Sequence, residues 1–201
     1  MANVDRPYGG LKPIGTLNGA AWNGKANMYL VPSADGTAMF VGDLVKPYTA
    51  GGTAGTVVNG IDCEGMPTCI QSAAGDPSLG VVVGFLPSFA DLTLRHRLVS
   101  TNRIALVCDD PNALYEIQEV SGGTALTSTE VGLNADVVVA AGSTTSGLSG
   151  MELDNATEAA TAGLNVRIIG LVRRPDNAYG EHAKWVVMLS DRSYAAAVAG
   201  V

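Results

Sequence analysis

Charged residues are scarce in this sequence, and basic residues are scarcer still. Asp, Glu, Lys and Arg make up 15% of the 201 residues, and 12 basic against 19 acidic side chains leave a net charge of −7 at pH 7. A nucleic-acid interface needs clustered Lys and Arg, because much of its affinity comes from releasing counterions from the phosphates. Here the only short basic clusters are Arg95-His96-Arg97 and Arg173-Arg174. We therefore expect no nucleic-acid partner.

Cysteine and histidine are also rare, which argues against a metal centre. Cys63, Cys69 and Cys108 lack the paired short spacings of a structural zinc site, and the only histidines, His96 and His182, stand alone. We predict no metal and no cofactor. We interpret the cysteines as reduced, partly buried thiols rather than as a disulfide between Cys63 and Cys69.

Targeting and catalytic patterns are missing as well. The first residues contain neither the basic nor the apolar part of a signal peptide, and no run approaches the ~20 apolar residues of a membrane helix. We expect a protein that is made in the cytoplasm and does not enter a membrane. The stretch 147–151 misses the nucleophile-elbow pattern because Met151 stands where glycine is required. His96 lies between two arginines and His182 in a charged turn, so we expect both to face solvent and predict that the protein is not an enzyme.

What the chain does contain is apolar residues, glycine and short β-type runs. Hydrophobic residues make up 47% of it, and 25 glycines interrupt them. Because helix-length patterns do not alternate with the β-type runs, we predict an all-β fold, a sandwich or a barrel with little helix. The Asp-Gly pair in Ser33–Gly36 is typical of a hairpin turn, and residues 151–162 have the composition of a short helix at most. The runs are 27–32, 38–45, 81–86, 104–108, 114–120, 136–141, 166–172 and 183–189.

The first 25 residues differ from the rest. Repeated Pro, Gly and Asn prevent regular structure there, yet large apolar side chains occur that a free disordered tail would lack. We predict an extended arm over residues 1–25, lying either on a partner or on its own domain, and a β-rich body over 26–201, with two sub-domains possible on either side of 109–112. The candidate anchors of the arm are Tyr8, Leu11, Ile14, Leu17 and Trp22.

The stretch 164–191 is the clearest hairpin signal in the chain. Two runs rich in Val and Ile flank a centre that contains Pro175, Asp176, Asn177 and Gly180, residues that favour turns. We predict a long hairpin with a charged loop. Arg173, Arg174 and Tyr179 are its candidate partner-binding residues.

The order of these features resembles the head decoration, or cement, proteins of tailed phages. The similarity lies in residues 10–43, in DDPNALYEIQE (109–119), in residues 133–154 and in IIGLVRRPDNAYGEHAKWVVML (168–189). The resemblance implies a β-rich virion protein on the capsid exterior that binds the major capsid protein and stiffens the shell. It also implies a homo-oligomer, for which we favour a trimer over a dimer, and it supplies no catalytic residues.

A ligand-binding function is the alternative. Other β-rich virion parts, such as the base of a head fibre, share this composition, and a glycan-binding module would use exposed aromatic side chains as stacking platforms. Aromatic residues are only 5% of the chain. Trp185, flanked by two valines, is expected in the core, which leaves Trp22, Tyr179 and Tyr194 as candidates.

Overall fold

The computed structural model describes residues 3–52 and 55–194, and in that part of the chain nearly every regular element is a strand. The helical structure described is a single 3-10 turn, η1 (Ser128–Glu130). The prediction of an all-β fold with little helix is therefore confirmed, and of the two architectures expected, a closed barrel is present. Within the described ranges, no helix is long and apolar enough to cross a membrane.

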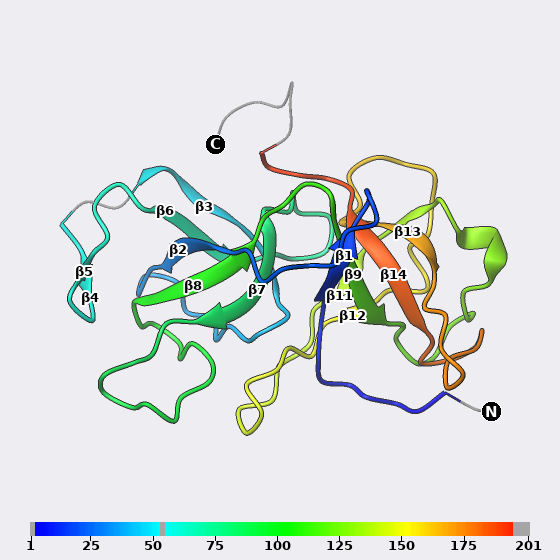
Figure 1. Ribbon diagram of the computed structural model, residues 1–201, viewed down its shortest axis with the longest axis horizontal. Helices are drawn as coiled ribbons and strands as arrows, with labels where there is room; N and C mark the ends of the chain where they lie inside the picture. The colour runs from blue at the N-terminus through cyan, green and yellow to red at the C-terminus, as the bar shows by residue number, and fades with distance from the viewer. Residues whose placement is uncertain (1–2, 53–54, 195–201) are drawn as a thin grey trace.

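The barrel forms the left half of the molecule in Figure 1. Valines on three of its strands, Val45, Val82 and Val107, pack together inside it with Tyr29 and Cys69. A small hairpin lies beside it, β4 (Val57–Val58) with β5 (Ile61–Asp62). In barrel order the strands are β2 (Asn27–Val31), β6 (Pro67–Gln71), β3 (Leu44–Gly52), β7 (Gly80–Phe85) and β8 (Arg103–Cys108).

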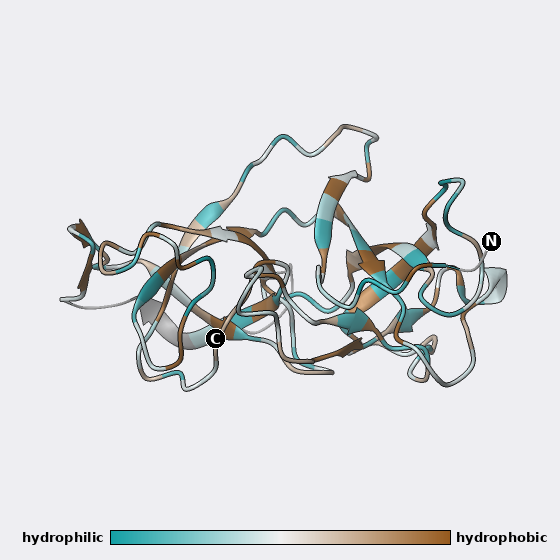
Figure 2. Cartoon of the chain, turned by 90° about the horizontal axis from the view of Figure 1, so that it is seen from below, coloured by the Kyte–Doolittle hydropathy of each residue, from teal (hydrophilic) through white to brown (hydrophobic). Residues whose placement is uncertain are grey.

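A five-stranded antiparallel sheet forms the right half of the molecule (Figure 1). Its strands alternate buried and partly exposed residues, the period-two pattern of a sheet that buries one face, and Figure 2 shows this as alternating hydrophobic and hydrophilic bands. A short pair, β11 (Val137–Val138) with β12 (Glu152–Leu153), packs against the buried face. In sheet order the strands are β1 (Lys12–Thr16), β9 (Ala113–Gln118), β14 (Lys184–Leu189), β13 (Val166–Leu171) and β10 (Asn134–Ala135).

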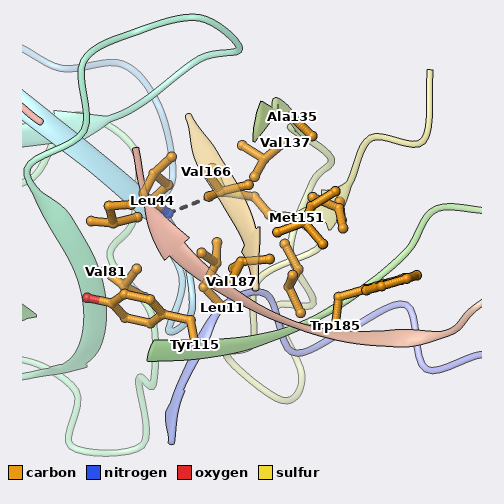
Figure 3. Packing of buried hydrophobic residues seen from close by; sticks show 14 of the residues in the cluster. Leu11, Leu44, Val81, Tyr115, Ala135, Val137, Met151, Val166, Trp185 and Val187 are labelled. Atoms are coloured by element: carbon orange, nitrogen blue, oxygen red, sulfur yellow. Dashed lines mark hydrogen bonds between the residues drawn. The ribbon is translucent and has the colours of Figure 1, made fainter. Parts of the chain in front are cut away.

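The two halves share one hydrophobic core, although the change from barrel to sheet falls at 109–112. Adjacent residues of the barrel strands face opposite sides, so Leu44 and Val81 point away from the barrel interior that Val45 and Val82 fill. Leu44 and Val81 belong to the same cluster as the sheet residues Tyr115, Val187 and Trp185, and Figure 3 shows Tyr115 beside Val81 and Trp185 at the other end of the cluster. This shared packing joins the barrel to the sheet.

The expected arm belongs in part to the body of its own chain. Leu11 is 1% exposed in the shared core, and β1 pairs with β9 at the edge of the sheet. Ordering an extended segment costs about 1–2 kcal/mol of backbone entropy per residue, which a few apolar anchors cannot offset alone. Here backbone pairing with β9 adds to the burial of Leu11. The arm was expected to lie either on a partner or on its own domain, and in the structure it lies on its own domain.

The predicted hairpin at Ser33–Gly36 is wrong. β2 pairs with β6 and β8, not with β3. Arg97 binds this segment from a distance, because its guanidinium donates hydrogen bonds to the carbonyl oxygens of Pro32, Asp35 and Thr37 and to the Asp35 carboxylate. The backbone N–H of Asp35 still donates to the Pro32 carbonyl oxygen, so a turn forms here, but β2 pairs with strands far along the chain.

Other local expectations had mixed outcomes. The long hairpin is confirmed, because β13 pairs with β14 and the turn-rich loop connects them. No helix forms over 151–162, where β12 is followed by bends. The helical turn lies instead at η1, which begins after a capping box, with Thr127 as N-cap and Glu130 three residues later. The cysteines are buried and form no disulfide with one another.

Candidate functional site

The loop of the long hairpin lies on the outer face of the sheet and is held there by charge. Arg174 makes a two-pronged contact with Glu116 of β9, with Nη1–Oε2 and Nη2–Oε1 distances of 3.0 and 3.1 Å. Such paired hydrogen bonds between a guanidinium and a carboxylate fix orientation as well as distance. The side chain of Glu116 is only 14% exposed, so this contact is partly shielded from water. Arg174 therefore has a structural partner within its own chain.

Arg173 and Tyr179 line an open depression beside this contact. The floor comes from the outer faces of β13 and β14, with Ile169, Leu171 and Val186, and the rim includes Val131 from the segment after η1. Tyr179 is 52% exposed, and its ring lies 5.9 Å from that of Trp185. The depression is mainly apolar and carries the exposed charge of Arg173 at its border.

The N-terminal segment is tied to the same loop. The Asn3 side chain donates to the carbonyl oxygens of Ala178 and Glu181 and accepts from the backbone N–H of Ala178. The backbone N–H of Arg6 donates to the buried side chain of Gln118 on β9. These contacts position residues 3–6 beside the loop without any regular element.

The five apolar anchors predicted for the arm end up in different environments. Tyr8, Ile14 and Leu17 are 49%, 41% and 50% exposed and remain available to a partner. Leu11 is buried in the core, so its assignment to a partner-binding surface is wrong for this conformation. Trp22 is half-buried and packs against the shared core beside the barrel. The structure thus groups Arg173 and Tyr179 and separates them from most of the arm.

Sequence reasoning missed the lining of the depression other than Arg173 and Tyr179. Val186 could have been found, because it alternates with the buried Trp185 and Val187 and must face outward. Ile169 occupies an irregularity in the register between β13 and β14, which no sequence pattern revealed. Val131 comes from a segment that reads only as polar loop.

Of the side chains considered for catalysis, Ser149 and His96 are held in structural contacts, and His182, expected to face solvent, has a side chain only 20% exposed. Ser149 is 0% exposed, and its Oγ accepts a hydrogen bond from the backbone N–H of Met151. His96 is also buried and stacks on Phe40 with the ring centroids 5.0 Å apart, which contradicts the expectation that it faces solvent. Trp185 lies in the core as predicted and donates from Nε1 to Glu119.

Comparison with known proteins adds no assignment. No protein-family model matches the chain, and neither a curated protein nor a solved structure shows significant similarity to it. The similarity to phage head decoration proteins therefore stays a prediction from the sequence.

Proposed function

We propose that this protein is a structural virion protein that binds the outer surface of an icosahedral phage capsid and cements neighbouring capsid subunits. We base this on the depression beside Arg173 and Tyr179, an open, mainly apolar surface on a rigid sheet with a cation at its border. Such a surface suits contact with another protein, since apolar burial supplies affinity and a border charge supplies orientation. The resemblance of the sequence to head decoration proteins points in the same direction.

The protein would stabilise the shell by contacting two or more capsid subunits at once. Packaged DNA pushes the subunits of a shell apart, and a protein that contacts two or more of them contributes binding free energy that is lost when they separate. Several weak contacts made by one rigid body reinforce one another, because each contact raises the effective concentration for the next. Exposed Tyr8, Ile14 and Leu17, outside the depression, supply further apolar contact points on the same chain.

The test uses expanded shells that lack the protein. The purified chain is expected to bind them and to raise their resistance to heat and low salt. Changing Arg173 and Tyr179 together to Ala is expected to weaken binding at least tenfold, about 1.4 kcal/mol. The matched control changes Arg95 and Tyr194, an exposed pair of the same residue types outside the depression, to Ala. The mass of each variant in solution separates a direct effect from a change in assembly.

Two results would contradict the proposal. One is a wild-type chain that binds no shell at any ionic strength. The other is an equal loss of binding in the test variant and the control variant, which would show that the depression is not part of the interface.

Glycan binding is the second candidate, and the exposed ring of Tyr179 favours it. A tyrosine 52% exposed at the edge of an open depression can stack on a sugar face, with Arg173 beside it as a hydrogen-bond donor. A glycan array probed with the full chain tests this function, and specific hits that disappear in Tyr179→Ala would support it over cementing.

A further inference from the structure

Three side chains able to bind metal ions meet where the N-terminal segment passes the loop between β13 and β14. Asp5, Glu152 and His182 each offer one ligand atom, and these atoms all lie within 4.8 Å of one another. Asp5 belongs to the N-terminal segment, Glu152 to β12 and His182 to the end of the loop, so no sequence spacing relates them. The set combines two carboxylates with an imidazole, which distinguishes it from an ordinary acidic patch.

The distance between Asp5 and His182 suits a small divalent cation. Asp5 Oδ1 lies 3.5 Å from His182 Nδ1. Two ligand atoms each about 2.1 Å from a tetrahedral zinc ion are about 3.4 Å apart. This pair is therefore already at a coordinating distance, and a Glu152 carboxylate oxygen lies within 4.8 Å of both atoms.

A buried amide orients both carboxylates. Gln118 Nε2 donates hydrogen bonds of 2.8 Å to Asp5 Oδ1 and to Glu152 Oε1. Gln118 is itself fixed, because it is 7% exposed and its Oε1 accepts from the backbone N–H of Arg6. Hydrogen bonds of this kind behind the ligands are a regular feature of metal sites, where they hold the ligating groups in place.

His182 carries the second indication of a ligand. Its Nδ1 is shielded from solvent and makes no hydrogen bond, although it faces the Asp5 carboxylate at 3.5 Å. A shielded ring nitrogen without a hydrogen bond is costly, and a cation bound between Nδ1 and the Asp5 carboxylate would satisfy both groups. The backbone of His182 is also left-handed, with φ of 60°, a conformation that non-glycine residues adopt at a cost.

We propose that Asp5, Glu152 and His182 form a binding site for a zinc-type divalent cation that fastens the N-terminal segment to the hairpin loop. An imidazole among the ligands favours zinc and its neighbours over calcium and magnesium, which prefer oxygen alone. Three protein ligands leave a fourth position for water or for a side chain of a partner. The site does not depend on the proposed capsid function.

The experiment uses the untagged full chain with Zn²⁺ and Co²⁺ as probes. One equivalent of zinc is expected to bind, and the melting temperature to rise, because the ion binds only the folded state. Cobalt is expected to give the visible absorption of a four-coordinate ion. His182→Asn, Glu152→Gln and Asp5→Asn are each expected to weaken binding at least tenfold, whereas Glu64→Gln, an exposed carboxylate on the barrel side, leaves it unchanged.

Asparagine is chosen at position 182 because it tolerates a left-handed backbone. Circular dichroism checks the fold of each variant, and the two near-isosteric carboxylate changes decide the matter if the His182 variant does not fold. Absence of saturable zinc or cobalt binding by the wild-type chain would overturn the site. So would unchanged affinity in the His182 and Glu152 variants, since the ion would then use other ligands. Calcium binding that survives His182→Asn and is lost in Glu152→Gln would overturn the zinc-type assignment.

Discussion

At the scale of the residue, the two arginines on either side of His96 behave in opposite ways. The Arg97 side chain is 0% exposed and lies 3.0 Å from the Asp35 carboxylate, whereas Arg95 is exposed. We expect Arg97→Met to lower the free energy of unfolding by about 3–5 kcal/mol, because it leaves the Asp35 carboxylate and several carbonyl groups without their donor. Urea denaturation measures this. Arg95→Met is the control, with a change below about 0.5 kcal/mol, and equal effects of the two changes would contradict the assignment.

The sequence could not have distinguished these arginines. They belong to one short basic cluster, and the difference arises from carbonyl oxygens at Pro32, Asp35, Thr37 and Thr101, residues that a sequence pattern does not relate to Arg97. The same holds for His96, whose burial depends on Phe40. Residue types predicted the exposure of Arg173 and Asp176 in the hairpin loop, but not the partial burial of His182 or the full burial of Arg97.

Asp43 makes stability depend on pH in the mildly acidic range. It is 0% exposed, and its burial raises its pKa from 3.8 to about 6, although Oδ2 accepts hydrogen bonds from Phe40 and Gln71. A folded-state pKa above the unfolded value means that the stabilising contribution is complete below about pH 4 and is lost as the pH rises through 6. Between pH 7 and pH 5 the wild type should therefore gain about 1 kcal/mol from this group.

The measurement compares wild type with Asp43→Asn in urea denaturation at both pH values. Other titrating groups contribute to both proteins and cancel in the difference. We expect the wild type to gain about 1 kcal/mol more than the variant on going to pH 5. Parallel curves for the two proteins would show that Asp43 is ionised in both states over this range.

At the scale of the element, the N-terminal segment contains one core position among exposed ones. Leu11 is 1% exposed and Leu17 is 50% exposed. We expect Leu11→Ala to cost about 2–5 kcal/mol of stability through lost burial and a residual cavity, whereas Leu17→Ala changes stability by less than about 0.5 kcal/mol. Thermal or urea unfolding of the two variants checks this, and equal values would place the segment outside the cooperative unit.

Truncation tests the same element more severely. Removing residues 1–8 leaves β1 and Leu11 in place, so the body should stay folded. Removing residues 1–25 takes away an edge strand and a core side chain, so we expect the body to lose its cooperative unfolding transition. A well-folded 26–201 fragment would contradict this and would make the segment a separable arm.

Elements with strong local signals were predicted, and elements defined by distant partners were not. The hairpin of β13 and β14 follows from its own turn residues, and the β9 strand from its alternation. The order of barrel strands does not follow from neighbouring sequence, because β2 pairs with β6 in parallel and with β8, far along the chain. The candidate depression was likewise predicted only in part. Its loop was predicted from the sequence, whereas the residues of its floor were identified only from the structure.

At the scale of the whole molecule, large apolar side chains are exposed at several separate places. Phe89 and Leu92, 72% and 75% exposed, lie in the loop between β7 and β8 on the barrel side, and Tyr179 and Val131 lie at the depression on the sheet side (Figure 1). A ring with cyclic symmetry needs two different patches on each subunit, whereas a twofold dimer needs one patch that matches itself. We propose that Phe89 and Leu92, which lie outside the depression, supply one of these patches in the trimer that the resemblance implies.

We accordingly expect a mass in solution of three times the 20.5 kDa of one chain. Changing Phe89 and Leu92 together to Ser should convert the trimer to monomers, because it removes one of the two patches that must meet in every contact. Val57→Ser is the control, since Val57 is 64% exposed on the small hairpin beside the barrel. Light scattering coupled to gel filtration gives the masses. This arrangement would be contradicted by a mass of two chains, or by a trimer that survives in the Phe89 and Leu92 variant. A chain that stays monomeric at its highest soluble concentration would contradict a preformed ring.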